Sequence, residues 1–164
     1  MTRLSKPPRI KVFEALGSIA DGRVEILKED DNVLVAEVKS STGEKTYDVI
    51  VDLGRKKVYS SDNGTIHRGY VGYPIIAVLM KRGLLPYDEK YADSLKGIPW
   101  KTLNETYKKY SVVEEEAFKI ARSRGVYRRH LEAFARKVLG ELARLELEFD
   151  EGLLSYKTGS TEAS

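Results

Sequence analysis

Polar and apolar residues alternate with two different periods in the first sixty positions. Apolar residues three and four positions apart between 9 and 20 predict a helix, which Gly22 is expected to end. Alternation with period two at 24–26 and 47–53, a near-continuous apolar run at 33–38 and the stretch 56–60 after a hairpin signal then predict four strands separated by short polar turns. Gly54 suits a two-residue hairpin between the last two strands. We therefore expect a helix followed by an antiparallel four-stranded meander.

The middle of the chain changes from strand patterns to helix patterns. Residues 61–72 are rich in glycine and show no hydrophobic period, which predicts a loop. Pro74 and the wholly apolar run at 75–80 predict a buried helix that begins at the proline. Two short helices are expected between 87 and 110, with tyrosine, leucine and tryptophan on their inner faces.

Near the C-terminus, apolar residues recur with alternating spacings of four and three, which is the seam pattern of a coiled coil. The seam residues are Leu131, Ala135, Val138, Leu142, Leu145 and Phe149. We expect a leucine-zipper-like helix that joins two copies of the chain into a homodimer. The seam covers only about two and a half heptads. The alternative is that the stripe docks on its own domain.

The expected fold class is therefore α+β, an N-terminal helix and a four-stranded meander packed by helices and followed by the zipper-like helix. The expected units are a disordered arm at 1–8, an α+β domain at 9–124, a dimerisation helix at 125–151 and a disordered tail at 152–164.

Composition narrows the class of protein. Charged residues make up 32% of the 164 positions, cysteine and glutamine are absent, and asparagine occurs three times. Many ion-pairing residues and few thermolabile amides are typical of a thermophile. The N-terminus has no apolar segment of a signal peptide or membrane anchor. We expect a cytoplasmic protein without a membrane partner.

Catalytic chemistry has little support in the sequence. The two histidines, His67 and His130, stand far apart, and neither a phosphate-binding loop nor a dinucleotide fingerprint is present. Asp48 and Asp52 share one face of a predicted strand and could hold Mg²⁺ for phosphodiester hydrolysis, although a solvated strand face has the same pattern. We expect no catalytic residue, no metal and no cofactor.

Basic and aromatic residues are interleaved in three places. Single-stranded nucleic acid is bound by bases stacked on aromatic rings while lysine and arginine follow the phosphates. The candidate binding residues are Lys56, Lys57 and Tyr59; His67, Arg68, Tyr70 and Tyr73; and Arg122, Arg124, Tyr127, Arg128 and Arg129. For any one tyrosine, packing in the core is the alternative, and for the arginines from 122 to 129 the alternative is the solvated face of a charged helix. The domain at 9–124 is expected to bind nucleic acid.

The order of predicted elements resembles the ThermoDBP family, which binds single-stranded DNA in hyperthermophilic crenarchaea. The resemblance implies a dimer that grips a strand in an apolar cleft with basic edges, but it assigns no individual residue. Residues 47–53 and 72–79 are also similar to SWIM zinc domains, although Tyr59-Ser60-Ser61 and Gly72-Tyr73-Pro74 replace the zinc ligands. That second resemblance implies a metal-free interaction scaffold.

The sequence thus predicts a sequence-tolerant protein that protects exposed single-stranded DNA in replication and repair. A protein-interaction scaffold and an RNA-binding protein are the alternatives, because stacking and phosphate contacts serve DNA and RNA equally.

Overall fold

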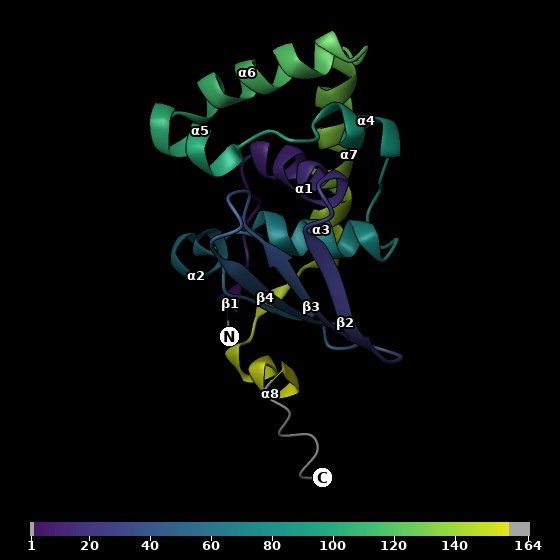
Figure 1. Cartoon of the computed structure of the whole chain (residues 1–164). Coiled ribbons are helices and arrows are strands. Elements are labelled where there is room, and N and C mark those ends of the chain that lie inside the picture. Colours follow the sequence, from purple (N-terminus) through teal and green to yellow (C-terminus); the bar gives the residue numbers. More distant parts are fainter. Residues whose placement is uncertain (1, 158–164) are drawn as a thin grey trace.

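One six-stranded sheet crosses the lower half of the computed structural model, which describes residues 2–157 (Figure 1). In spatial order the strands are β1 (Thr2–Arg3), β6 (Glu148–Phe149), β5 (Lys57–Ser60), β4 (Thr46–Asp52), β3 (Val33–Lys39) and β2 (Val24–Glu29). Neighbours from β2 to β5 pair antiparallel, whereas β5 and β6 pair parallel. The α+β class is confirmed, but the sheet has six strands where four were expected.

The turn between β4 and β5 is longer than the expected two-residue hairpin. Asp52 pairs with Lys57 across the ladder, so that residues 53–56 form the connection. The positive φ lies at Lys56, at 58°, and not at Gly54. The Asp52 carboxylate accepts hydrogen bonds from the backbone and the guanidinium of Arg55, at 3.2 and 2.9 Å. The hydrogen bonds of the Asp52 side chain therefore fix this turn. The expectation of a two-residue hairpin at Gly54 did not take them into account.

The prediction of a disordered arm at 1–8 is wrong for residues 2–8. Thr2 pairs with Phe149 in the sheet, and the Leu4 amide donates to the Leu147 carbonyl at 2.9 Å. The Ser5 amide donates to the Gly69 carbonyl at 2.9 Å. The backbone partners come from two distant parts of the chain, which a local sequence pattern does not reveal.

Helices cover one face of the sheet and build outward from it (Figure 1). They are α1 (Ile10–Ala20), α2 (Asn63–Arg68), α3 (Tyr73–Lys81), α4 (Glu89–Ser94), α5 (Trp100–Tyr107), α6 (Tyr110–Ser123) and α7 (Arg128–Leu145). Helix α3 lies against β2, β3 and β4, and its residues 74–80 are all buried, as the apolar run predicted. Helix α1 packs on α3 and also contacts α4 and α7, so it occupies the centre of the helical layers.

The apolar stripe of α7 packs into the core of its own chain. Leu131 and Val138 are fully buried, and Leu142 is 5% exposed. Helix α7 ends at Leu145, and Phe149 belongs to strand β6. The prediction of a continuous zipper-like helix at 125–151 is therefore wrong. The apolar stripe instead docks on its own domain. No unit boundary falls at 124/125, because α7 contacts α1 directly.

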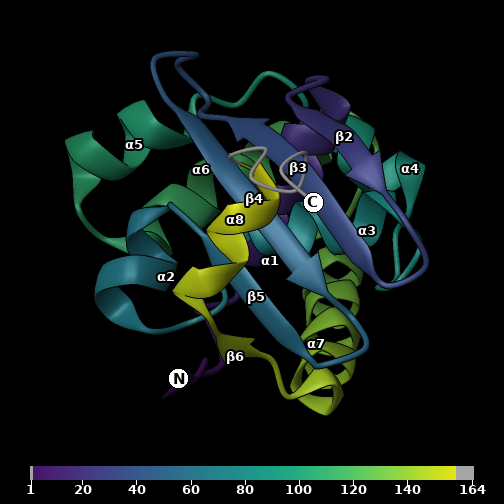
Figure 2. The same ribbon diagram turned by 90° about the horizontal axis from the view of Figure 1, so that it is seen from below.

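The segment after β6 covers the opposite face of the sheet, where Figure 2 shows α8 lying across β4. The short helices η1 (Glu151–Leu153) and α8 (Leu154–Lys157) place Leu153 against Ile50 and Tyr59. Lys157 forms ion pairs with Glu37 and, at 3.4 Å, with Asp48. The predicted disordered tail is wrong for 152–157, and residues 158–164 lie outside the described residues.

Candidate functional site

Segment 61–72 contains helix α2 where a loop was expected. The Asp62 carboxylate caps this helix by accepting bonds from the Thr65 amide at 3.1 Å and from the Thr65 hydroxyl at 2.9 Å. A Cβ at position 72 would collide with the Asp62 carboxylate, so only glycine fits there. The capped helix ends at Arg68, and Tyr73 begins α3 directly after the close approach at Gly72.

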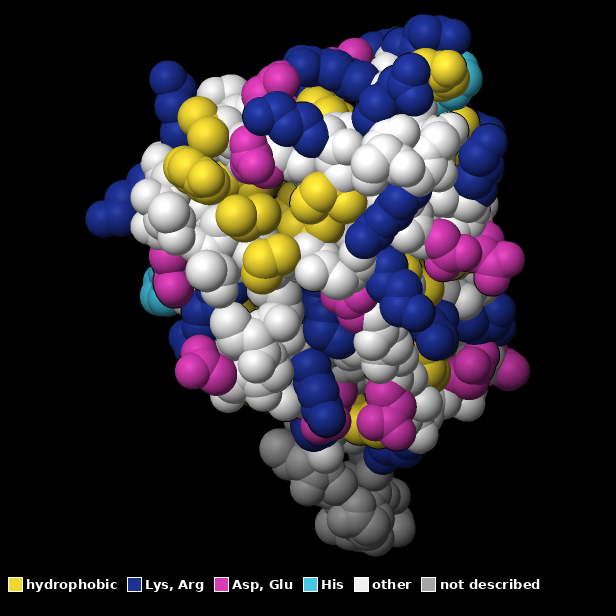
Figure 3. Space-filling model, turned by 45° about the horizontal axis from the view of Figure 1, so that its top comes forward, with side chains coloured by type: hydrophobic (Ala, Val, Ile, Leu, Met, Phe, Trp, Pro, Cys, Tyr) yellow, Lys and Arg dark blue, Asp and Glu magenta, His cyan; other side chains and the backbone are white. Residues whose placement is uncertain are grey.

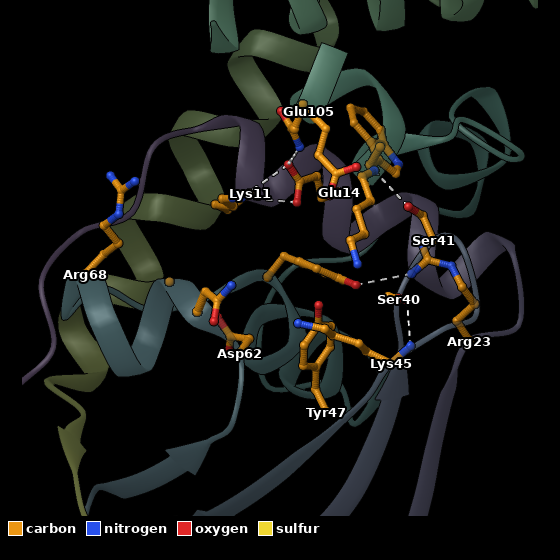
Figure 4. A pocket seen from close by; sticks show the side chains of 16 residues that line it. Lys11, Glu14, Arg23, Ser40, Ser41, Lys45, Tyr47, Asp62, Arg68 and Glu105 are labelled. Carbon is orange, nitrogen blue, oxygen red and sulfur yellow. Dashed lines mark hydrogen bonds and ion pairs between the residues drawn. The ribbon is translucent and has the colours of Figure 1, made fainter. Parts of the chain in front are cut away.

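A cavity of about 420 Å³ lies where α1, α2, α3 and α5 meet the β3–β4 end of the sheet (Figure 4). Its cations are Lys11, Arg23, Lys45, Arg68 and Lys101, and its carboxylates are Glu14, Asp62 and Glu105. Tyr47 and Tyr73, which are partly buried, provide aromatic surface in the same wall, and Trp100, a core residue only 2% exposed, borders it. The cavity therefore combines a surplus of positive charge with aromatic rings.

Three buried polar atoms in this wall have no hydrogen-bond partner. They are Arg23 Nη2, Trp100 Nε1 and Asn104 Oδ1, and within residues 2–157 no other buried side-chain nitrogen or oxygen lacks one. Asn104 Nδ2 donates to Glu14 at 3.1 Å, which supports the assigned orientation of the amide. Nearly all buried polar groups in proteins are paired, and an unpaired one costs about 1–3 kcal/mol. Two donors and one acceptor are thus unpaired in residues that line the cavity, although the three atoms themselves are buried.

Glu14 and Lys11 form a buried ion pair at the α1 side of the cavity (Figure 4). The Lys11 ammonium donates to both Glu14 oxygens at 3.3 Å. Burial by itself would lower the pKa of Lys11, but the charge of Glu14, the nearby Tyr70 and Tyr110 and the hydrogen bond to Glu14 together outweigh burial, and the pKa is raised above its ordinary value. The Lys11 ammonium therefore remains charged near neutral pH and lies against the Glu14 carboxylate.

Arg23 and Tyr73 form the opposite wall. Arg23 Nη1 donates to the Lys39 carbonyl at 2.6 Å and to the Tyr73 hydroxyl at 3.3 Å. The Tyr47 and Tyr73 rings meet edge to face with centroids 6.3 Å apart. Burial raises the pKa of the Tyr73 hydroxyl, and the Arg23 charge opposes this only in part. The hydroxyl is therefore neutral at physiological pH.

The remaining cations stand at the mouth of the cavity. Lys45 and Arg68 are exposed, and neither forms an ion pair with another described residue. Lys101 lies 3.8 Å from the carboxylate of Glu44, which is 73% exposed. Salt screens such exposed charges beyond about 8–10 Å, so the mouth attracts anions that come within that distance.

The first predicted basic-aromatic cluster has no exposed aromatic ring. Tyr59 is only 8% exposed and packs against Phe149 with ring centroids 5.6 Å apart, so it cannot stack on a base. The Lys56 ammonium lies 3.9 Å from the Glu146 carboxylate. Lys57 begins β5 and does not line the cavity.

The second predicted cluster reaches the cavity in part. Arg68 and Tyr73 line it, whereas His67 and Tyr70 do not. His67 is exposed on α2. The Tyr70 ring fills the space beside Gly64, where a Cβ would collide with it. Tyr70 therefore has the packing role that was the alternative for each tyrosine.

The third predicted cluster lies at the corner between α6 and α7. Some of its residues are bound to other parts of the chain, and the others stay on the surface. Arg124 donates to the carbonyl oxygens of Ser94 at 3.1 Å and Lys96 at 2.7 Å, and thereby ties down the end of α4. Arg128 forms ion pairs with Glu115 and Glu132. Arg122, Tyr127 and Arg129 remain together on the surface of the corner.

Sequence reasoning missed most of the cavity wall. Lys11, Arg23, Lys45 and Lys101 come from four separate segments, and none stands in a basic-aromatic cluster. The single tryptophan of the chain, Trp100, was expected in the core, and it lies there at 2% exposure while also bordering the cavity.

The alternative metal site at Asp48 and Asp52 has competing cations in the structure. Asp48 lies 3.4 Å from the Lys157 ammonium, and Asp52 is 2.9 Å from the Arg55 guanidinium. Within residues 2–157, no three acidic, histidine or cysteine side chains are grouped as metal ligands.

None of the helices in that range is long and apolar enough to cross a membrane.

Comparison with known proteins places the chain in a family. A search of curated proteins and a search of solved structures found no match. A family model matches residues 4–148, a range that contains the whole cavity wall and the α6–α7 corner but not η1 and α8. The chain belongs to the family described as Uncharacterised conserved protein UCP014422.

Proposed function

We propose that the protein binds single-stranded nucleic acid and that the cavity between α1, α2 and α5 receives one nucleotide of the strand. The observation that carries this proposal is the coincidence of three unpaired buried polar atoms with a cation-rich mouth. A volume of about 420 Å³ lies within the range of small-molecule pockets. A nucleotide has the matching parts, because it combines a phosphate, a flat ring and polar edges.

Each part of the wall has a role in this proposal. Lys45, Arg68 and Lys101 at the mouth attract the phosphates without reading sequence. Arg23 Nη2 and Trp100 Nε1 are buried and unpaired in the free protein, and they donate to acceptors of the bound nucleotide after their side chains turn toward it. Tyr47 and Tyr73 provide aromatic surface for contact with the base or sugar. The strand is bound with little sequence preference, as suits a protein that covers exposed single strands in replication and repair.

The proposal is tested by fluorescence anisotropy with single-stranded DNA, RNA and duplex DNA at several salt concentrations. We expect single strands to bind more tightly than duplex, with affinity falling as salt rises. The variant Lys45→Gln/Lys101→Gln removes two charges from the mouth. It should reduce the slope of log affinity against log salt by about 1.4, since each phosphate contact on a single strand contributes about 0.7.

The matched control is Lys81→Gln/Lys90→Gln, which removes two exposed lysines outside the cavity. This control should keep the wild-type salt dependence. If the two double variants lost affinity for single strands equally, the cavity would not be part of the binding site. Tight binding to duplex without binding to single strands would overturn the proposed function.

A further inference from the structure

A second basic surface lies at the corner between α6 and α7. Tyr127 is 40% exposed there, and two guanidinium groups lie over its ring. The guanidinium carbon of Arg122 is 4.3 Å from the ring centroid, and that of Arg129 is 4.8 Å from it. Both distances are within the range of cation–π attraction. Figure 3 shows Lys and Arg side chains crowded along the upper right edge of the molecule, where this corner lies.

The charge of this corner is not neutralised by the described part of the chain. Arg122 and Arg129 form no ion pair with residues 2–157, whereas the neighbouring Arg128 is paired with two carboxylates. Helix α7 begins here without an acidic residue in its first turn. The positive end of its dipole adds to the two guanidinium charges. Like charges held together in this way are stabilised by an anion from outside.

We propose that Arg122, Tyr127 and Arg129 form a second contact for the same strand, and this inference rests on the proposed function. The Tyr127 ring orients the two guanidinium groups, whose N–H edges can donate to a phosphate. Since the two guanidinium groups lie over the Tyr127 ring, a base can stack on the outer plane of a guanidinium group. The ligand class is thus a phosphodiester strand with unpaired bases.

Helix α6 connects the two contacts and sets the distance between them. Its first residue, Tyr110, lies at the cavity end, where the Lys11 ammonium is 5.2 Å from the tyrosine ring centroid. Its last residue, Ser123, directly precedes the corner. The 14 residues of α6 span about 21 Å. A strand must therefore be several nucleotides long to reach both sites, and only such a strand gains affinity from linking them.

The experiment measures affinity for oligothymidylates from about 4 to about 16 nucleotides, the range of site sizes on known single-strand binding folds. We compare wild type with Arg122→Gln/Arg129→Gln. The control Arg136→Gln/Lys137→Gln removes two exposed charges further along α7. The corner variant should lose about tenfold or more for the longest oligonucleotides, because linked contacts raise avidity strongly, and little for the shortest. The control should keep the wild-type length dependence.

The possible results separate this inference from the proposed function. If the corner variant binds long strands like wild type while Lys45→Gln/Lys101→Gln binds them weakly, the corner contact is wrong and the cavity stands. If the corner variant weakens short and long strands equally, the corner is not a second contact of the kind described. If wild type binds no oligonucleotide of any length, both proposals fail. Circular dichroism of each variant verifies that these exposed substitutions leave the fold intact.

Discussion

Leu142 provides the sharpest test of how α7 is used. The sequence pattern placed this leucine in a dimer seam, whereas the structure buries it within its own chain at 5% exposure. Truncation of a buried leucine to alanine costs about 2–5 kcal/mol, and the cost falls when the site opens to solvent. Leu142 borders a groove of about 150 Å³, so some of the new space joins an existing opening. We therefore expect Leu142→Ala to lower the free energy of unfolding by about 2.5–3.5 kcal/mol.

The assay combines urea unfolding with the mass measured by light scattering. Gly140→Ala is the matched control because it adds a methyl group to the same helix, and its Cβ would meet nothing within 4 Å. Replacing an exposed helical glycine by alanine should stabilise the protein by about 0.5–1 kcal/mol. Neither substitution should alter the mass. The two variants should thus change the unfolding midpoint in opposite directions.

A different result would refute the packing of α7. If Leu142→Ala kept the wild-type free energy of unfolding but had half the wild-type mass, the stripe would join two chains. The burial of Leu131 and Val138 within one chain would then be incorrect as well, because these residues share the same face of the helix.

Two further predictions concern the cavity wall. Gly17→Ala would place a methyl carbon 2.7 Å from Trp100 Nε1 and displace the indole. We expect a shift in the emission of this single tryptophan and weaker binding of single strands; an unchanged spectrum would contradict the contact. Burial raises the pKa of Tyr47 and Tyr73 above their ordinary value of 10.0. Since the folded pKa exceeds the unfolded one, the corresponding stability is complete below pH 10.0 and declines as pH rises further. Urea unfolding on both sides of that pH should show the decline, and Tyr73→Phe should reduce it.

The sequence alone determined the elements whose signal is local. The apolar run at 75–80 can be satisfied only by burial on all sides, and α3 is buried there. The alternating residues of β3 and β4 place Val49 and Val51 on the helical face, as strand geometry requires. These properties depend on neighbours within a few positions, so they can be derived without knowing the fold.

The short elements at both ends of the chain could not be derived in this way. Strand β1 and helix α8 are only two and four residues long, too short to show a period. They form because β6 and β4 lie beside them in space. Helix α2 is also short, although Asp62 three positions before Thr65 is a capping signal that could have identified it.

The residues of the candidate site likewise divide into those that the sequence identified and those that it did not. Sequence clustering selected Arg68 and Tyr73, and both line the cavity. It could not select Arg23 or Trp100, since their unpaired atoms acquire meaning only when distant segments bury them together. The stripe of α7 shows the same limit, because its spacing requires an apolar partner but does not identify it. Composition and periodicity determine which surfaces must be buried, and the tertiary structure decides what buries them, because that choice depends on contacts between residues far apart in the chain.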